Sequence, residues 1–190
     1  MEWQVGLIAL AAYAVGSFPT GVVISRRRFG IDVRDMGSGN IGATNITRNF
    51  GWKAGVITFL VDFMKGYLGL RIATALCPHF PWIETVAGSA VVLGHCFSLF
   101  LGLRGGKGVA TTLGCLFAAA PLAGVLMAVC YLSLLAVTRV SAIGSLVGMG
   151  VAAVTVWIAE YSEDVRLMVS LCAAIVFVRH QRNIRRWLRF

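Results

Sequence analysis

The sequence is poor in charged residues, and above all in acidic ones. Only 13% of its 190 residues are charged, and Asp and Glu together number 8 against 17 Lys and Arg. With 58% hydrophobic residues, a soluble domain of this size would expose more surface than so few charges can cover. The hydrophobic residues fall in long runs separated by short polar segments, which is the pattern of a membrane protein.

Several kinds of catalytic and metal site are also missing. The five cysteines form no CxxC pair, which argues against a metal site and against a disulfide framework. No nucleophile elbow, Ser-His-Asp arrangement or carboxylate pair suited to glycoside hydrolysis is visible. We therefore expect no metal and no cofactor, and chemistry that depends on cations, backbone amides and at most one histidine.

The hydrophobic runs suggest seven spans. They cover about 3–25, 54–76, 83–103, 109–120, 122–138, 142–159 and 165–178. No basic residues precede the first run, so we read it as a retained span and not as a cleaved signal. The fourth run is short for a span, which needs about 20 residues. The fourth and fifth runs could therefore form one helix bent at Pro121.

The basic residues decide between these alternatives. They gather in the segment 26–53 and in the tail, which holds Arg179, Arg182, Arg185, Arg186 and Arg189. The positive-inside rule places both segments in the cytoplasm, and only a chain that turns near Pro121 puts them on one side. The sequence thus predicts an all-α polytopic membrane protein with seven transmembrane helices. Its N-terminus lies outside, its C-terminus is cytoplasmic, and residues 1–190 form a single domain.

Three polar segments converge on the predicted cytoplasmic face, and the first is the glycine-rich stretch 37–48. Glycine permits close backbone approach, so successive N–H groups can face an anion. Arg48 adds a fork suited to phosphate oxygens. The alternative is a flexible connector, although a loop of this length is more often ordered and functional. The glycines and neutral hydrogen-bonding residues of the stretch are Gly37, Ser38, Gly39, Asn40, Gly42, Thr44 and Asn45.

The second polar segment, 102–112, is typical of a phosphate loop that leads into a helix N-terminus. Its centre reads Arg104-Gly105-Gly106-Lys107-Gly108, and Lys107 supplies a positive charge. It is not a Walker A motif, because Gly108 stands where the magnesium-binding Ser or Thr should follow the lysine. This counts against an ATPase. The alternative is a basic anchor at a helix end, which suits Arg104 better than Lys107.

The third segment begins at Arg179. On a continuing helix His180 and Asn183 share a face, where they can contact a substrate hydroxyl with His180 as a candidate proton acceptor. The tail arginines are more typical of lipid-headgroup anchors. Two spans also carry polar residues. His95 in the third is a candidate functional residue or a packing histidine, and Asp62 and Lys65 in the second are read as an intrahelical structural pair.

These segments, in this order, resemble the bacterial acyl-phosphate:glycerol-3-phosphate acyltransferase family. The resemblance rests on residues 37–48, on Gly94-His95, on residues 104–114 and on the His180-x-x-Asn183-Ile-x-Arg pattern, and it extends over almost the whole chain. One departure is Gln181, where many relatives carry a basic residue. The resemblance implies an enzyme that transfers a fatty acyl group from acyl phosphate to the 1-hydroxyl of glycerol 3-phosphate. The products are lysophosphatidic acid and phosphate, in the first step of phospholipid synthesis.

The resemblance also implies a place, partners and site residues. It implies a multi-pass protein of the bacterial inner membrane with its site on the cytoplasmic face. Membrane lipid and the soluble enzyme that makes acyl phosphate are candidate partners, and nucleic acid is not. The implied catalytic residues are Ser38, Arg48, Lys107, His180, Asn183 and His95. The implied substrate-binding residues are Gly37, Gly39, Asn40, Gly42, Thr44, Asn45, Arg104, Gly105, Gly106 and Gly108.

Two other functions compete with this hypothesis. An organic-anion or phosphate transporter would share basic, glycine-rich sites, but transporters bind near the bilayer midplane within broken helices of repeated halves. The sequence shows no repeat, and its polar segments cluster at one face. A lipid-binding scaffold without activity would leave the ordered Lys, Arg, His and Asn residues unexplained. For the enzyme, the acceptor of the hydroxyl proton is either His180 or a substrate phosphate, and we favour the phosphate.

Overall fold

The structure, a computed structural model, describes residues 2–187, and every regular element in this range is a helix. The prediction of an all-α protein is confirmed. Arg189, assigned to the basic tail, lies outside the described residues. The elements are α1 (Glu2–Ser17), α2 (Thr20–Phe29), η1 (Val33–Asp35), α3 (Ala43–Phe50), α4 (Trp52–Leu76), α5 (Ile83–Cys96), η2 (Leu99–Leu101), α6 (Val109–Ala119), α7 (Pro121–Thr138), α8 (Ser141–Ile158), α9 (Glu163–Arg179) and α10 (Gln181–Trp187).

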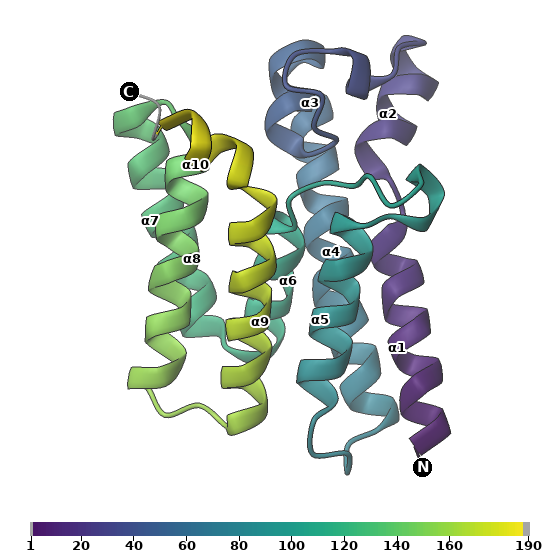
Figure 1. Cartoon of the computed structure of the whole chain (residues 1–190), viewed down its shortest axis with the longest axis vertical. Coiled ribbons are helices and arrows are strands. Elements are labelled where there is room, and N and C mark those ends of the chain that lie inside the picture. The colour runs from purple at the N-terminus through teal and green to yellow at the C-terminus, as the bar shows by residue number, and fades with distance from the viewer. Residues whose placement is uncertain (1, 188–190) are drawn as a thin grey trace.

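The long helices run along one axis of the molecule and pack in pairs (Figure 1). Helix α1 lies against α5 and α4 against α6, and both contacts are made through glycine. A Cβ on Gly16 or Gly94 would overlap a backbone carbonyl across the α1–α5 contact, and one on Gly66 or Gly114 would do so across α4–α6. Small residues at such crossings let backbones approach closely, which is the main source of helix association in lipid.

Each of the seven hydrophobic runs is largely helical. Four stretches are long and apolar enough to cross a membrane by length and composition, namely Trp3–Phe29, Ile83–Leu101, Pro121–Thr138 and Ser141–Ile158. The chain ends α6 at Ala119 and starts α7 at Pro121, so the predicted break at this proline is confirmed. Helix α4 is long enough but carries Asp62 and Lys65 in its middle. The number of spans and their orientation stay predictions.

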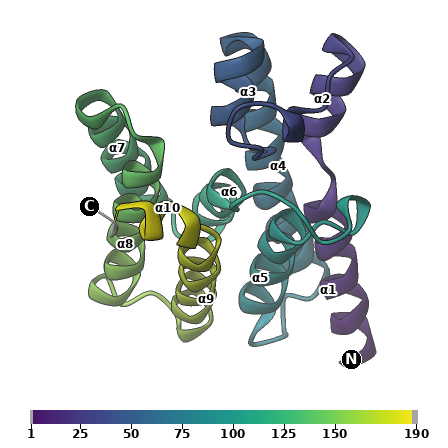
Figure 2. The ribbon, with the colours of Figure 1, turned by 45° about the horizontal axis from the view of Figure 1, so that its top comes forward.

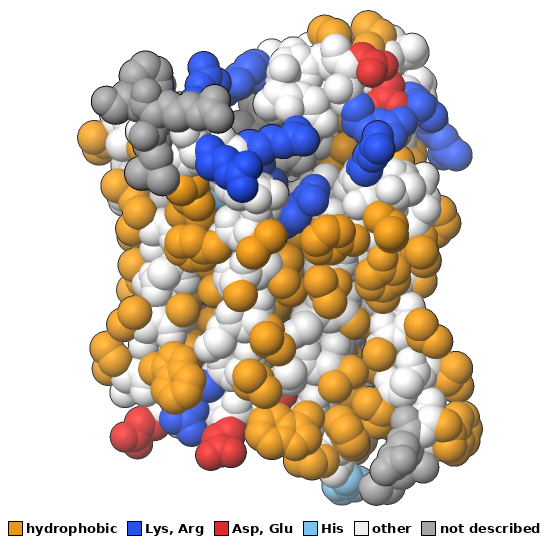
Figure 3. Space-filling view, in the orientation of Figure 1, with side chains coloured by type: hydrophobic (Ala, Val, Ile, Leu, Met, Phe, Trp, Pro, Cys, Tyr) orange, Lys and Arg blue, Asp and Glu red, His pale blue; other side chains and the backbone are white. Residues whose placement is uncertain are grey.

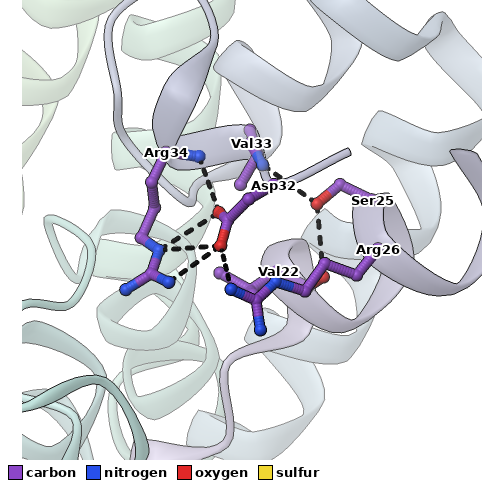
Figure 4. A network of polar contacts seen from close by, with 6 residues as sticks. All are labelled: Val22, Ser25, Arg26, Asp32, Val33 and Arg34. Atoms are coloured by element: carbon purple, nitrogen blue, oxygen red, sulfur yellow. Dashed lines mark hydrogen bonds and ion pairs between the residues drawn. The ribbon is translucent and has the colours of Figure 1, made fainter. Parts of the chain in front are cut away.

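The segment between the first two runs is partly helical and is held by side-chain hydrogen bonds, which argues against the alternative of a flexible connector. Helix α2 continues to Phe29 and ends at Gly30 in a left-handed conformation. Beyond it, the Asp32 carboxylate accepts hydrogen bonds from the Arg34 guanidinium and pairs with Arg26 at 2.7 Å (Figure 4). The hydrogen bond from Arg34 lowers the pKa of Asp32 to about 2. Ser25 Oγ accepts from the Val33 amide at 3.1 Å, which holds the loop against α2.

Charge is distributed unevenly along the long axis. Most Lys and Arg side chains visible in Figure 3 lie at the upper end, and a band of hydrophobic side chains lies below them. Helices α2, α3 and α10 and the loop before α6 all gather toward this basic end (Figures 1 and 2). The three polar segments that are far apart in the sequence are therefore neighbours in space.

Candidate active site

A cavity of about 580 Å³ opens among these segments. It is lined by the residues before and within α3, by the start of α6, by α4 and α5, by the α7–α8 connection and by the polar residues after α9. Its wall thus contains contributions from all three polar segments that the sequence singles out.

The structure places all six predicted catalytic residues on the lining of this cavity, namely Ser38, Arg48, His95, Lys107, His180 and Asn183. Five of the predicted substrate-binding residues line it as well: Asn40, Gly42, Thr44, Asn45 and Gly108. The other five, Gly37, Gly39, Arg104, Gly105 and Gly106, are not among its lining residues. Their contact with substrate stays a prediction, and the geometry of the described residues does not favour it.

Gly105 and Gly106 are held by the protein itself. The Gly105 amide donates to the carbonyl of Cys96 at 3.1 Å, and the Gly106 amide donates to that of His95 at 2.9 Å. Their own carbonyls accept from the Arg179 guanidinium. These N–H groups are therefore not free to cradle a phosphate, and the loop serves as a support for Lys107.

Gly37 and Gly39 form turns with positive φ angles of 56° and 69°. They shape the loop and do not face the cavity. Arg104 is exposed and is not among the lining residues. Its position suits the anchor that the sequence left open for it.

Asn45 holds the first glycine-rich segment together. Its side-chain amide donates to the carbonyls of Met36 at 3.0 Å and Asn40 at 2.9 Å. Its Oδ1 accepts from the Ser38 amide at 3.1 Å and from Asn49 at 3.0 Å. Asn45 borders the cavity, but its hydrogen-bonding groups are engaged by the loop, so its main effect is to place Ser38 and Asn40 on the rim.

Lys107 and Asn183 meet across the cavity wall. Lys107 Nζ donates to Asn183 Oδ1 at 2.6 Å, which joins the second polar segment to the third. Burial lowers the pKa of Lys107, and the nearby charge of Arg179 lowers it further. Gly108, at a φ of 82°, then turns the chain into α6, whose first residues Val109 and Ala110 also line the cavity. The positive end of the α6 dipole therefore adds to the lysine charge.

His180 is 1% exposed and lies at the end of α9. Its Nδ1 is 2.8 Å from the carbonyl of Val176, which can only accept, so the ring proton resides on Nδ1 and Nε2 is an acceptor. Burial lowers the pKa of His180 to about 4, and the ring is neutral near pH 7. The predicted continuing helix is wrong, because α10 begins anew at Gln181. Asn183 remains a neighbour, since its amide donates to the His180 carbonyl at 2.8 Å.

The buried polar residues of α4 and α5 form a cluster below the rim. Asp62 and Lys65 pair at 2.9 Å, as the sequence indicates, and are 2% and 7% exposed. Thr20 donates to Asp62 at 2.8 Å, and Lys65 donates to the carbonyl of Phe18 at 3.1 Å. His95 Nδ1 lies 3.7 Å from the carboxylate, beyond hydrogen-bonding distance. Charges in an apolar interior need such partners.

The wall formed by α7 and α8 was missed in the sequence. Ser141 Oγ lies 3.0 Å from the Tyr131 hydroxyl and 3.2 Å from Thr44 Oγ1, so a chain of hydroxyls connects α7 and α8 with α3. Arg139, at a φ of 58°, also lines the cavity. The available signal was the short basic connection between the fifth and sixth runs, which the predicted topology places on the same face as the other polar segments.

The cavity also has an apolar part, built from α4, α6 and α7. Its residues are Phe59, Leu113, Met127, Ala128 and Leu132. Phe59 and Leu132 are also exposed on the molecular surface, so the apolar part reaches that surface. A ligand with a charged head and a long apolar chain matches this division.

The sequence and the structure both have close relatives. The family model described as glycerol-3-phosphate acyltransferase matches residues 6–189. A glycerol-3-phosphate acyltransferase of Myxococcus xanthus is 41% identical over 186 residues, covering 96% of this chain and 95% of the relative.

Two solved structures of an integral membrane glycerol 3-phosphate acyltransferase superpose closely. The glycerol 3-phosphate form has a TM-score of 0.92 at 36% identity, and the lysophosphatidic acid form has 0.90 at 35%. Each match covers 98% of this chain and 92% of the other.

Proposed function

The chain belongs to the glycerol-3-phosphate acyltransferase family, and from this premise we infer that it acylates glycerol 3-phosphate in the cavity described above. It is a membrane acyltransferase, and its product is lysophosphatidic acid. We propose fatty acyl phosphate as the acyl donor and the 1-hydroxyl as the group acylated. The observation that carries this proposal is a single cavity in which Arg48, Lys107 and Arg139 border an apolar compartment.

The proposed donor requires no nucleophile from the protein. An acyl phosphate is a mixed anhydride, so its carbonyl is already activated and can be attacked directly by the acceptor hydroxyl. The remaining difficulty is that both substrates carry phosphate. Two unit charges 4 Å apart repel by about 4 kcal/mol at an effective dielectric constant of 20. The cations of the cavity offset this repulsion and align the hydroxyl with the carbonyl.

We propose that a substrate phosphate accepts the hydroxyl proton. With a pKa of about 4, His180 is a weak base near neutral pH, whereas a phosphate monoester has a second pKa of about 6. His180 Nε2 can still accept a hydrogen bond and orient the hydroxyl. The tetrahedral intermediate then collapses, the anhydride C–O bond breaks, and inorganic phosphate leaves.

The charge and hydrophobicity around the cavity support a position for the site at one face of the membrane. The basic end, where the cavity opens, is proposed to face the cytoplasm of a bacterial inner membrane, by the positive-inside rule. Seven spans with an external N-terminus follow from the same rule. The apolar compartment beside Phe59 and Leu132 would receive the acyl chain from the lipid, so that the chain need not cross water.

The test is a reconstituted reaction. The purified protein in detergent micelles is supplied with glycerol 3-phosphate and either palmitoyl phosphate or palmitoyl-CoA, and both phosphate release and lysophosphatidate are measured. We expect both products with palmitoyl phosphate and no lysophosphatidate with the thioester. Arg48→Ala should abolish turnover at the same protein concentration. Use of the thioester would refute the donor, and a wild-type protein that forms no lysophosphatidate from either donor would refute the function.

A further inference from the structure

Arg179 is the one residue of the tail whose guanidinium, within the described range, bonds to the glycine loop. Its Nε donates to the carbonyl of Gly106 at 3.0 Å, and an Nη donates to that of Gly105 at 2.9 Å. The guanidinium also lies 5.1 Å from the centre of the Phe97 ring. Arg182, Arg185 and Arg186 are exposed. Arg179 therefore differs from the headgroup anchors with which the sequence groups it.

These bonds complete the fixation of the two glycines. On one edge their amides donate to the last carbonyls of α5, and on the other edge their carbonyls accept from the end of α9. Charge-assisted hydrogen bonds of this kind are stronger than neutral ones. The backbone directly before Lys107 is thus held between two helices.

The same contacts set the position of the lysine relative to its partner. Arg179 ends α9, and Asn183 lies four residues further on, in α10, where its Oδ1 accepts from Lys107. The backbone before Lys107 is therefore bonded to Arg179 at the end of α9, and the tip of the Lys107 side chain is bonded to Asn183 just beyond it. We propose that Arg179 is a positioning residue that fixes Lys107 against Asn183 for binding of the glycerol 3-phosphate phosphate. This inference rests on the proposed function of the cavity.

The geometry explains why an arginine stands here. Two consecutive carbonyls and an aromatic face are satisfied together by a planar fork, whereas a lysine ammonium is a point charge on a flexible stem. Lysine at this position would keep the charge and one hydrogen bond but would not hold both carbonyls. A conservative change therefore separates positioning from charge.

The experiment compares Arg179→Ala and Arg179→Lys with Arg182→Ala, which removes an exposed arginine of the following turn. Steady-state kinetics with varied glycerol 3-phosphate give KM and kcat separately, and thermal unfolding reports on folding. We expect Arg179→Ala to lower kcat/KM on the order of 10²-fold, since displacements of about 1 Å have effects of this size. KM for the acceptor should account for most of the change. Arg179→Lys should lie between, and Arg182→Ala should stay within about twofold of wild type.

A double-mutant cycle with Asn183→Ala tests whether Arg179 acts through the lysine. If it does, Arg179→Ala should lower kcat/KM by less than about threefold once Asn183 is absent. Fully additive effects would overturn the proposal. It would also be overturned if Arg179→Ala and Arg182→Ala lowered kcat/KM equally and both losses varied with the anionic lipid content of the nanodiscs. If Arg179→Ala does not fold, Arg179→Lys replaces it in the double-mutant cycle. An unchanged KM for glycerol 3-phosphate in a folded Arg179→Lys protein then overturns the proposal. A wild-type protein without activity would instead refute the proposed function.

Discussion

Replacing Lys107 with methionine tests the centre of the proposed site. Methionine keeps most of the length and volume of the side chain but removes the ammonium. The lysine has its base fixed by the glycine loop and its tip 2.6 Å from Asn183, so the change removes a charge whose position is set. The lysine is half-buried, and the loss should therefore appear in binding of the phosphate and not in folding.

The size of the effect follows from the charge removed. Opposite unit charges 4 Å apart attract by about 4 kcal/mol at an effective dielectric constant of 20. Partial exposure and salt reduce this to about 3 kcal/mol, and every 1.4 kcal/mol is a factor of ten. We expect kcat/KM for glycerol 3-phosphate to fall on the order of 10²-fold.

The matched control is Arg104→Ala, which removes a cation three residues earlier in the same loop. Arg104 is exposed and does not line the cavity, so its loss should change kcat/KM by no more than about threefold. Both variants are assayed for lysophosphatidate formation at fixed ionic strength. A loss below about fivefold for Lys107→Met, or equal losses for the two variants, would refute the assignment of the anion site to Lys107.

Three further changes probe the surroundings of the site. Gly106→Ala places a methyl group against the His95 ring, so the loop must shift. We expect kcat/KM to fall at least tenfold, and wild-type kinetics would contradict the close contact between Gly106 and His95. His180→Gln should lower kcat/KM but keep the acid limb of the pH profile near pH 6, because the substrate phosphate titrates there whereas His180 has a pKa of about 4; loss of that limb would identify His180 as the base. Asp62→Asn leaves Lys65 buried without its counter-charge, which costs about 3–5 kcal/mol, and an unchanged thermal midpoint in detergent would refute that pairing.

His180 also makes stability depend on pH. Its pKa in the fold, about 4, is below the value of about 6.5 for an unfolded histidine, so the unfolded chain binds a proton more readily between these values. Stability is then fully present above pH 6.5 and declines as the pH falls toward 4. The thermal midpoint of His180→Gln should be less sensitive to pH over this window than that of the wild type. If the thermal midpoints of the two proteins changed with pH in parallel, His180 would not be a buried neutral ring in the folded protein.

The helices were readable from the sequence because composition alone determines them. Runs of apolar residues become helices in lipid, where no other open structure satisfies the backbone, and Pro121 separates two of them because it cannot donate to the preceding turn. The boundaries were less accurate. The first run breaks near Pro19, and the helix of the third run ends at Cys96, well before its predicted end at Leu103. Such local breaks depend on contacts between helices, as in the bond from Lys65 to the Phe18 carbonyl.

The side chains on the cavity were partly predictable, and their hydrogen bonds were not. The six catalytic candidates stand out as polar residues in an apolar chain, and all line one cavity. Whether a glycine amide faces a ligand depends on which carbonyls lie opposite, and the sequence does not contain this. Gly105 and Asn45 were therefore assigned to substrate although their polar groups bond within the protein. Arg139 and Ser141 were missed because neither belongs to a glycine-rich stretch.

The internal use of these amides changes how the site must recognise its anions. The amides of Ser38, Gly42 and Gly106 all donate to protein acceptors, so these three amides are not available to bind a phosphate. Their glycines allow the backbone to pass close to α5 and to Asn45, and this fixes the side chains that follow. We therefore expect anion binding to depend on Lys107, Arg48 and the first turn of α6, all of which line the cavity. Lysine and arginine at the edge of a membrane are ordinary, and we expect the fixed placement of Lys107 against Asn183 to distinguish a binding site from a basic anchor.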